Sequence, residues 1–273
     1  GTRMGVHRGL EAPEVAKFGT TQIALLSIAQ VGALTTTGIA DLAATQIRAF
    51  ATTQLNAMSS TNVNALTETQ FAALTSTQIT GLSTTQASIL SATNIAAMTT
   101  TQAGALTATQ LGRLTSEALI AFDATQFAAF SATQVRALTT TQIGNLEAAD
   151  IAEFTTTQIA GLATTQVRGL TETAVAALAA TQIAALTVPQ IQSLSTTSLV
   201  GFADTQIGAL TTTQIGGLLA PQVSAFGATT VAALTATQIS AMSATQIAAL
   251  GATNFAALDT TQIGALTATQ MRS

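Results

Sequence analysis

Residues 210–218 read LTTTQIGGL, and this phrase recurs with small variations through most of the chain. From Leu10 to Ser273 the sequence divides into 33 octads with no insertion or deletion. Position one is always Leu, Phe or Met, and position six is a bulky apolar residue everywhere except at Ala87 and Ala103. All ten Phe residues occupy these two positions, so the pattern predicts that both are buried.

Neither a strand nor one long helix can bury both positions on the same side. In a strand, positions one and six have opposite parity and face opposite sides of the sheet. In a continuous helix, eight residues advance by about 800°, so the apolar stripe drifts by about 80° in each octad. The chain is therefore expected to bend within every octad.

A short helix in each octad satisfies the pattern, as residues 210–218 illustrate. With Thr211 as the N-cap, Gln214 lies three residues further on and completes a capping box, in which each side chain bonds to the other residue's backbone N–H. Leu210 before the cap and Ile215 in the fourth helical position form the pair of a hydrophobic staple. The sequence predicts one such helix in each octad.

Proline and charged residues support this prediction. Pro13, Pro189 and Pro221 all stand at position four, in the first helical turn, where a backbone N–H has no partner to lose. Ten of the twelve acids stand at positions two to five, and all six bases within the octads stand at positions seven and eight, as the helix dipole favours. These ten acids are Glu11, Glu14, Glu68, Glu117, Asp123, Glu147, Asp150, Glu172, Asp204 and Asp259. The six bases are Lys17, Arg48, Arg113, Arg136, Arg168 and Arg272.

We therefore predict an all-α solenoid of very short capped helices, one in each of 33 repeats, because a fixed short period is typical of solenoids. If each octad turns the chain by about 90° to 120°, three or four octads close one coil. The alternative is a β-solenoid with about three octads per coil, which the strand propensity of Thr and Ile favours and the proline positions oppose.

The chain is predicted to hold one domain after a short lead. Residues 1–9 lie outside the octad register and carry Arg3, His7 and Arg8. Residues 10–273 are expected to form a single octapeptide-repeat solenoid, because neither a linker nor a change of composition interrupts them. Positions one and six are expected to face the axis, position seven is expected to be exposed, and small residues at position eight are expected to let neighbouring segments approach.

Composition argues against an enzyme. The chain has no Cys, no Tyr, no Trp and a single His, and only 7% of its residues are charged. A serine nucleophile would lack a base, so no catalytic residue and no cofactor are predicted. Glu147, Asp150 and Glu153 form the densest acidic cluster within the octads, yet no metal site is predicted from them. Eight Lys and Arg residues against twelve acids argue against a nucleic-acid surface.

No membrane span or signal peptide is predicted. No stretch approaches the roughly 18 consecutive apolar residues that a transmembrane helix needs. The segment before Leu10 lacks the apolar run of a signal peptide. The absence of cysteine is compatible with an extracellular protein but does not require one.

Threonine at position four is the one regular feature that packing does not require. It occupies this position in 27 of the 33 octads. The exceptions are Pro13, Ala29, Glu117, Ala149, Pro189 and Pro221. Stacked octads would present Thr in files, so an ice- or surface-binding solenoid is the alternative function, and the exceptions count against it.

The octad phrase also resembles a known kind of repeat array. The stretches that begin at Leu162, Leu178 and Leu258 read LATTQVRGL, LAATQIAAL and LDTTQIGAL. They are similar to Thr/Ala-rich arrays in very large secreted or surface proteins of proteobacteria, often described as adhesin-like. The resemblance implies a non-enzymatic, structural role outside the cell or at its surface. The calcium-binding nonapeptides that accompany such arrays, GGxGxDxUx, do not occur here.

The sequence thus predicts a structural repeat protein that forms a stalk, fibre or filament. Neither end of the array shows the polar capping repeat that a free-standing solenoid usually carries. The expected partners are copies of the chain, stacked end to end, or flanking repeats of a longer chain. No nucleic-acid partner is expected.

Overall fold

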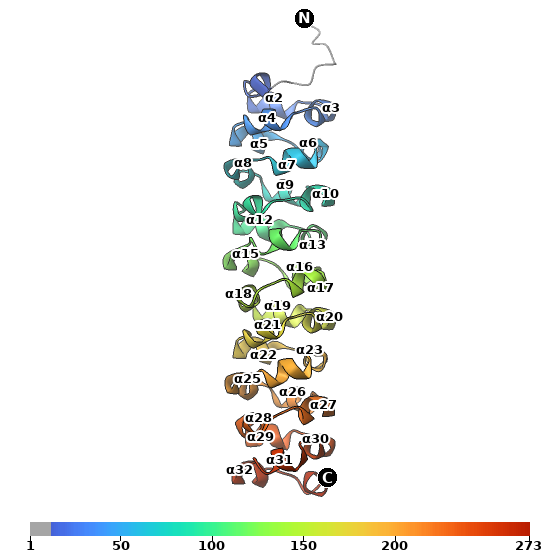
Figure 1. Ribbon diagram of the computed structural model, residues 1–273. Helices are drawn as coiled ribbons and strands as arrows, with labels where there is room; N and C mark the ends of the chain where they lie inside the picture. Colours follow the sequence, from blue (N-terminus) through green and yellow to red (C-terminus); the bar gives the residue numbers. More distant parts are fainter. Residues whose placement is uncertain (1–11) are drawn as a thin grey trace, which may run out of the picture. The chain divides into compact units, whose positions relative to one another are not determined.

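The computed structural model describes residues 12–273, and nearly every octad in this range forms one short helix (Figure 1). The described residues contain no β-strand, so the β-solenoid alternative was wrong and the prediction of an all-α solenoid is confirmed. The chain divides into two compact units, residues 1–138 and 139–273, although the octad register continues unchanged across the division. Each unit is described separately below, and a single solenoid over residues 10–273 stays a prediction.

The described part of the first unit contains sixteen helices of four to six residues. They are α1 (Ala12–Val15), α2 (Thr20–Ala24), α3 (Ile28–Gly32), α4 (Thr36–Ala40), α5 (Ala44–Ala49), α6 (Thr52–Ala57), α7 (Ser60–Asn64), α8 (Glu68–Ala72), α9 (Ser76–Thr80), α10 (Thr84–Ala87), α11 (Ala92–Ala96), α12 (Thr100–Ala105), α13 (Ala108–Leu111), α14 (Ser116–Leu119), α15 (Ala124–Ala128) and α16 (Ala132–Arg136).

The second unit continues in the same way and ends in a 3-10 turn. Its helices are α17 (Thr140–Gly144), α18 (Ala148–Ala152), α19 (Thr156–Gly161), α20 (Thr164–Arg168), α21 (Glu172–Ala176), α22 (Ala180–Ala185), α23 (Val188–Ser193), α24 (Thr196–Val200), α25 (Asp204–Ala209), α26 (Thr212–Gly217), α27 (Ala220–Ser224), α28 (Ala228–Ala233), α29 (Ala236–Ser240), α30 (Ala244–Ala249), α31 (Gly251–Phe255), α32 (Thr260–Gly264) and η1 (Gln270–Arg272).

Three octads close one coil in each unit. In the first unit α4 packs against α7, α7 against α10, and α10 against α13. In the second unit α19 packs against α22, α22 against α25, and α25 against α28. Every helix therefore meets the third helix along the chain, 24 residues away. The helices of each unit form three files, which we name by the remainder when the helix number is divided by three: file 0, file 1 and file 2.

The corners of the coil lie at positions one and two. In the repeat around α26, Leu210 and Thr211 are both extended, with φ/ψ of −61°/125° and −68°/158°. These two residues separate consecutive helices and change the direction of the chain. One corner differs, because Leu250 is helical and Gly251 follows with φ +72°, a backbone conformation that favours glycine.

Positions one and six build the core, as predicted. Position six is buried from Val15 to Ile247, and position one is buried from Leu34 to Leu258. One part of the core is aromatic: Phe122, Phe127 and Phe130 pack edge to face with ring centroids 5.0 to 5.9 Å apart. Each helix is too short to be stable alone, so this shared core holds the coils together.

The predicted caps are also present. Thr211 accepts a hydrogen bond from the Gln214 backbone N–H at 3.1 Å, and Gln214 Oε1 accepts from the Thr211 N–H at 2.7 Å. Pro189 and Pro221 lie in the first turns of α23 and α27, where no N–H is required.

Candidate functional site

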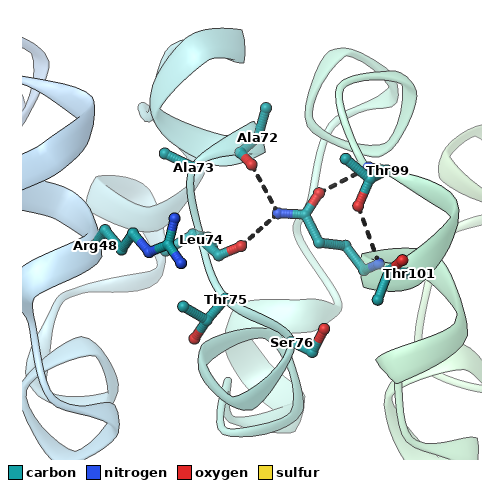
Figure 2. A pocket seen from close by; sticks show the side chains of 9 residues that line it. Arg48, Ala72, Ala73, Leu74, Thr75, Ser76, Thr99 and Thr101 are labelled. Atoms are coloured by element: carbon teal, nitrogen blue, oxygen red, sulfur yellow. Dashed lines mark hydrogen bonds between the residues drawn. The ribbon is translucent and has the colours of Figure 1, made fainter.

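The glutamine at position five joins each coil to the coil before it. Gln102 of α12 receives the Thr99 N–H on Oε1 at 2.7 Å, which is the expected capping bond. Its Nε2 donates to the carbonyls of Ala72 and Leu74 at 3.1 and 2.6 Å (Figure 2). Ala72 is the last residue of α8, and Leu74 lies in the link between α8 and α9. One carboxamide therefore caps the start of its own helix and the end of a helix in the preceding coil, and we call this arrangement the Gln clamp.

The Gln clamp recurs in both units. From Gln46 onward, eighteen Gln side chains at position five donate within their own unit to a position-one carbonyl 28 residues earlier, at 2.5 to 3.0 Å. Most of these Gln side chains are less than 5% exposed. Short helices leave many backbone groups without intrahelical partners, so a side chain that satisfies groups at two helix ends is unusually valuable here.

Sequence reasoning found only half of this role. The capping box accounts for Oε1, whereas the bonds of Nε2 reach residues 28 to 31 positions away and depend on the size of the coil. One signal was present in the sequence. A capping box accepts Glu as readily as Gln, yet position five carries Glu only at Glu14. A carboxylate cannot donate, so this preference indicates that the NH₂ group is needed.

The surface of each unit is dominated by position four. From Thr21 to Thr269 every side chain at this position is exposed. In the first unit file 1 presents Thr37, Thr61, Thr85, Thr109 and Thr133. In the second unit file 1 presents Thr157, Thr181, Thr205, Thr229 and Thr253. File 1 therefore carries only Thr at this position among the described side chains.

Five of the six departures from Thr lie on the other two files. Ala29, Ala149 and Pro221 stand in file 0, and Glu117 and Pro189 stand in file 2. The sixth, Pro13, belongs to α1 of file 1, and its side chain is not among those described. Sequence reasoning treated these interruptions as weakening a regular Thr surface. The three-octad coil shows that the other five leave file 1 of each unit intact.

An open hollow of about 350 Å³ lies beside the Gln clamp of α12. Figure 2 shows the side chains that line it. It is lined by Arg48 from α5, by Thr75 and Ser76 at the start of α9, and by Thr99 and Thr101 at the start of α12. These side chains supply hydroxyl groups and one guanidinium, which can hydrogen-bond a polar group. The lining includes no base that could activate a hydroxyl nucleophile.

The acidic residues mostly serve helix starts. Asp150 accepts the Glu147 N–H at 2.7 Å and so replaces Gln in the capping role. The Asp123 carboxylate caps α15, and bonds from the Thr125 hydroxyl and the Gln126 N–H lower its pKa. Within residues 12–273, no three His, Cys, Asp or Glu side chains are grouped so as to hold a metal ion. Arg3, His7 and Arg8 lie outside the described residues.

None of the described helices is both long and apolar enough to cross a bilayer. Position seven is exposed at Arg48 and Arg168, as expected, but Gly112, also at position seven, faces the next coil. A Cβ atom added at Gly112 would lie 2.6 Å from the Ala137 carbonyl there. Position eight approaches a neighbouring coil as expected, because a Cβ atom added at Gly217 would clash with the Val188 side chain. Contacts this close require small residues along the seam.

These features define a helical repeat protein in which a Thr/Ala-rich octad is the structural unit. The family model of the ALTTAQ repeat matches residues 39–76. Within that segment residues 65–70 read ALTETQ, which contains the Thr cap and the clamp glutamine, Thr67 and Gln70. Comparison with curated proteins gives no match.

Proposed function

We propose that this chain is a structural, non-catalytic repeat protein that forms part of a stalk, fibre or filament outside the cell. The support for an extracellular role is the resemblance of the octads to Thr/Ala-rich arrays of large adhesin-like proteins. The support for a structural role is the repetition itself, because the same core positions and the same Gln clamp join successive coils within each unit.

The observation that carries the proposal is the complementarity between the first and last described coils. In the first coil, Nε2 of Gln22 and of Gln30 makes no hydrogen bond within residues 12–273, and both side chains are exposed. In the last coil, the carbonyls of Leu258 and Leu266 accept no hydrogen bond from the described residues. The equivalent Leu210 carbonyl, two coils earlier, accepts from Gln238 at 2.7 Å.

The last coil also exposes apolar side chains that are buried in the coils before it. Ile263, at core position six, is 40% exposed, and Met271 is 56% exposed, whereas Ile239 in the preceding coil is fully buried. A further coil of the same kind would cover these side chains and donate to the unpaired carbonyls. Such a contact joins one end to the opposite end and therefore propagates as a filament. The next coil is supplied by another copy or by flanking repeats of a longer chain.

Sedimentation at micromolar concentration tests this proposal. The wild-type chain is expected to form long end-to-end assemblies, visible by negative-stain microscopy. The double variant Ile263→Glu with Met271→Glu is expected to remain monomeric with unchanged circular dichroism. A matched double variant on the side of the coils, Thr213→Glu with Thr237→Glu, is expected to assemble normally. A monomeric wild-type chain, or equal assembly of all three proteins, would contradict end-to-end stacking.

A second function, binding to ice or to another ordered surface, is favoured by the uninterrupted Thr of file 1. Around Thr181, Thr229 and Thr253 the neighbouring surface positions hold Ala and Gly, so the methyl and hydroxyl groups stand clear of larger side chains. Thermal hysteresis measures this activity. Thr181→Lys with Thr229→Lys is expected to abolish hysteresis, whereas Thr213→Lys with Thr237→Lys on file 2 is expected to preserve it. Absence of hysteresis in the wild type would exclude ice binding.

A further inference from the structure

In the first unit, the octad of α14 lacks the glutamine of the Gln clamp, while the two backbone groups that the clamp would bind are both described. Ala118 stands at position five of the octad that contains α14. Thr115 still caps the helix, because its hydroxyl accepts the Ala118 N–H at 3.1 Å. The Thr115 N–H has no acceptor within residues 12–273, and the Leu90 carbonyl, 28 residues before Ala118, has no donor there.

The preceding octad shows what these two groups require. There Gln110 Oε1 accepts the Thr107 N–H at 2.7 Å, and Gln110 Nε2 donates to the Leu82 carbonyl at 2.7 Å. Thr115 and Leu90 occupy the same octad positions as Thr107 and Leu82. The difference between Gln and Ala is a CH₂–CONH₂ group, so a primary carboxamide is the group that satisfies both partners.

The protein surface is hollowed at this point. A hollow of about 240 Å³ is lined by Leu90 and Ser91 on one coil and by Thr115, Glu117 and Ala118 on the next. Both unpaired backbone groups thus belong to residues that line it. A water molecule takes about 30 Å³ in the liquid, so the hollow has room for a group of four heavy atoms.

We propose that the hollow at Ala118 binds a primary carboxamide, carried by a small amide or by an Asn or Gln side chain of another chain. The carboxamide oxygen accepts from the Thr115 N–H, and its NH₂ group donates to the Leu90 carbonyl. The two bonds reproduce those of Gln110 in the neighbouring octad.

Other common polar groups fit this site less well. A carboxylate offers no donor to the Leu90 carbonyl and is repelled by Glu117 at the rim. An ammonium group donates to Leu90 but leaves the Thr115 N–H unpaired. A tertiary amide accepts but cannot donate. Only a group that accepts and donates at once pairs both the Thr115 N–H and the Leu90 carbonyl, and this requirement discriminates among these groups.

Fluorine NMR of 2-fluoroacetamide with the complete chain tests the proposal. The comparison is made with Ala174→Gln present in every protein, because Ala174 also replaces a clamp glutamine and its own octad could otherwise bind the amide. Saturable line broadening is expected with Ala174→Gln alone, and binding at least tenfold weaker when Ala118→Gln is added, since its carboxamide fills the hollow. Fluoroacetate and N,N-dimethyl-2-fluoroacetamide are expected not to bind.

Two tripeptides separate the sources of the carboxamide. Competition by acetyl-Gly-Gln-Gly, but not by acetyl-Gly-Glu-Gly, would indicate a protein side chain as an occupant; competition by neither would restrict the site to small amides. The proposal is overturned if adding Ala118→Gln to Ala174→Gln leaves more than half of the saturable signal, or if all three fluorinated compounds bind alike. Because Ala118→Gln adds a clamp that most octads already have, it is expected to fold at least as stably as the wild type.

Discussion

Removal of one Gln clamp from the middle of the second unit gives the sharpest test of what joins the coils. Gln214 is 2% exposed and belongs to α26. Its Oε1 accepts the Thr211 N–H at 2.7 Å, and its Nε2 donates to the carbonyls of Ile183 and Leu186 at 2.8 and 2.6 Å. Gln214→Ala is therefore expected to leave two backbone groups without partners, the Thr211 N–H and the Leu186 carbonyl, because the Ile183 carbonyl still accepts from the Leu186 N–H at 3.1 Å.

The expected cost follows from these two groups. An unsatisfied buried polar group costs about 1–3 kcal/mol. The lower end applies here, because the equivalent octad at Ala118 opens into a surface hollow that water can enter. We expect Gln214→Ala to lower the free energy of unfolding by about 2 kcal/mol. Thr213→Ala, at the neighbouring exposed position, is the control and should change it by less than about 0.5 kcal/mol.

A third variant separates the two halves of the clamp. Gln214→Glu keeps an oxygen that can accept the Thr211 N–H, but at neutral pH it places a carboxylate against the Ile183 and Leu186 carbonyls. If the contact between coils is the larger contribution, Gln214→Glu should be at least as unstable as Gln214→Ala. If the helix cap dominates, it should resemble the wild type.

Urea denaturation followed by circular dichroism measures the global effect, and native-state hydrogen exchange locates it. Because repeat arrays can unfold in parts, the exchange data should show faster opening of the coils around α22 and α26 than of coils elsewhere in the unit. Gln214→Ala and Thr213→Ala within about 0.5 kcal/mol of each other would refute the view that the clamp stabilises the stack.

Three further predictions concern the core, one cap and one corner. Leu210→Asp should lower stability by several kcal/mol in urea denaturation, because it buries an unpaired charge, whereas exposed Arg168→Ala should change it by less than about 0.5 kcal/mol. The pKa of Asp123 is lowered, chiefly by the Thr125 hydroxyl. The contribution of Asp123 to stability is therefore present above its unfolded pKa and is lost as the pH falls through its folded pKa. Asp123→Asn should remove this part of the acid sensitivity, measured by urea denaturation from pH 6 to pH 2. Gly251→Ala should lower the melting temperature, since φ is +72° there, by an amount that corresponds to about 1 kcal/mol; an unchanged value would mean that the corner relaxes.

The local structure of the octad could be predicted because it depends on neighbours in the chain. The Thr211 hydroxyl and the Gln214 carboxamide cap a helix that begins between them, and no distant residue is needed for these bonds. The burial of Leu210 and Ile215 follows from apolar periodicity. The dipole preference explains why Asp204 stands in a first turn and Arg168 in a last turn.

The site-level features could not be predicted in the same way. The octad pattern allows either three or four octads in each coil. The carbonyls that the Gln102 side chain can reach differ between these two arrangements, so its partners in the preceding coil could not be predicted. The same choice decides which position-four side chains share a face. With three octads per coil, Pro189 and Pro221 fall on different faces from Thr181 and Thr205, and a regular file of Thr results.

Sequence by itself therefore determined the element: a capped helix of four to six residues, its buried positions and its exposed ones. Tertiary structure alone decided which octads meet. The turn at each corner is set by two extended residues, such as Leu210 and Thr211, whose torsion angles many sequences can adopt. Packing of the core and the reach of the glutamine side chain select the coil of 24 residues, and only in that coil do the Leu90 carbonyl and the Thr115 N–H line the same hollow.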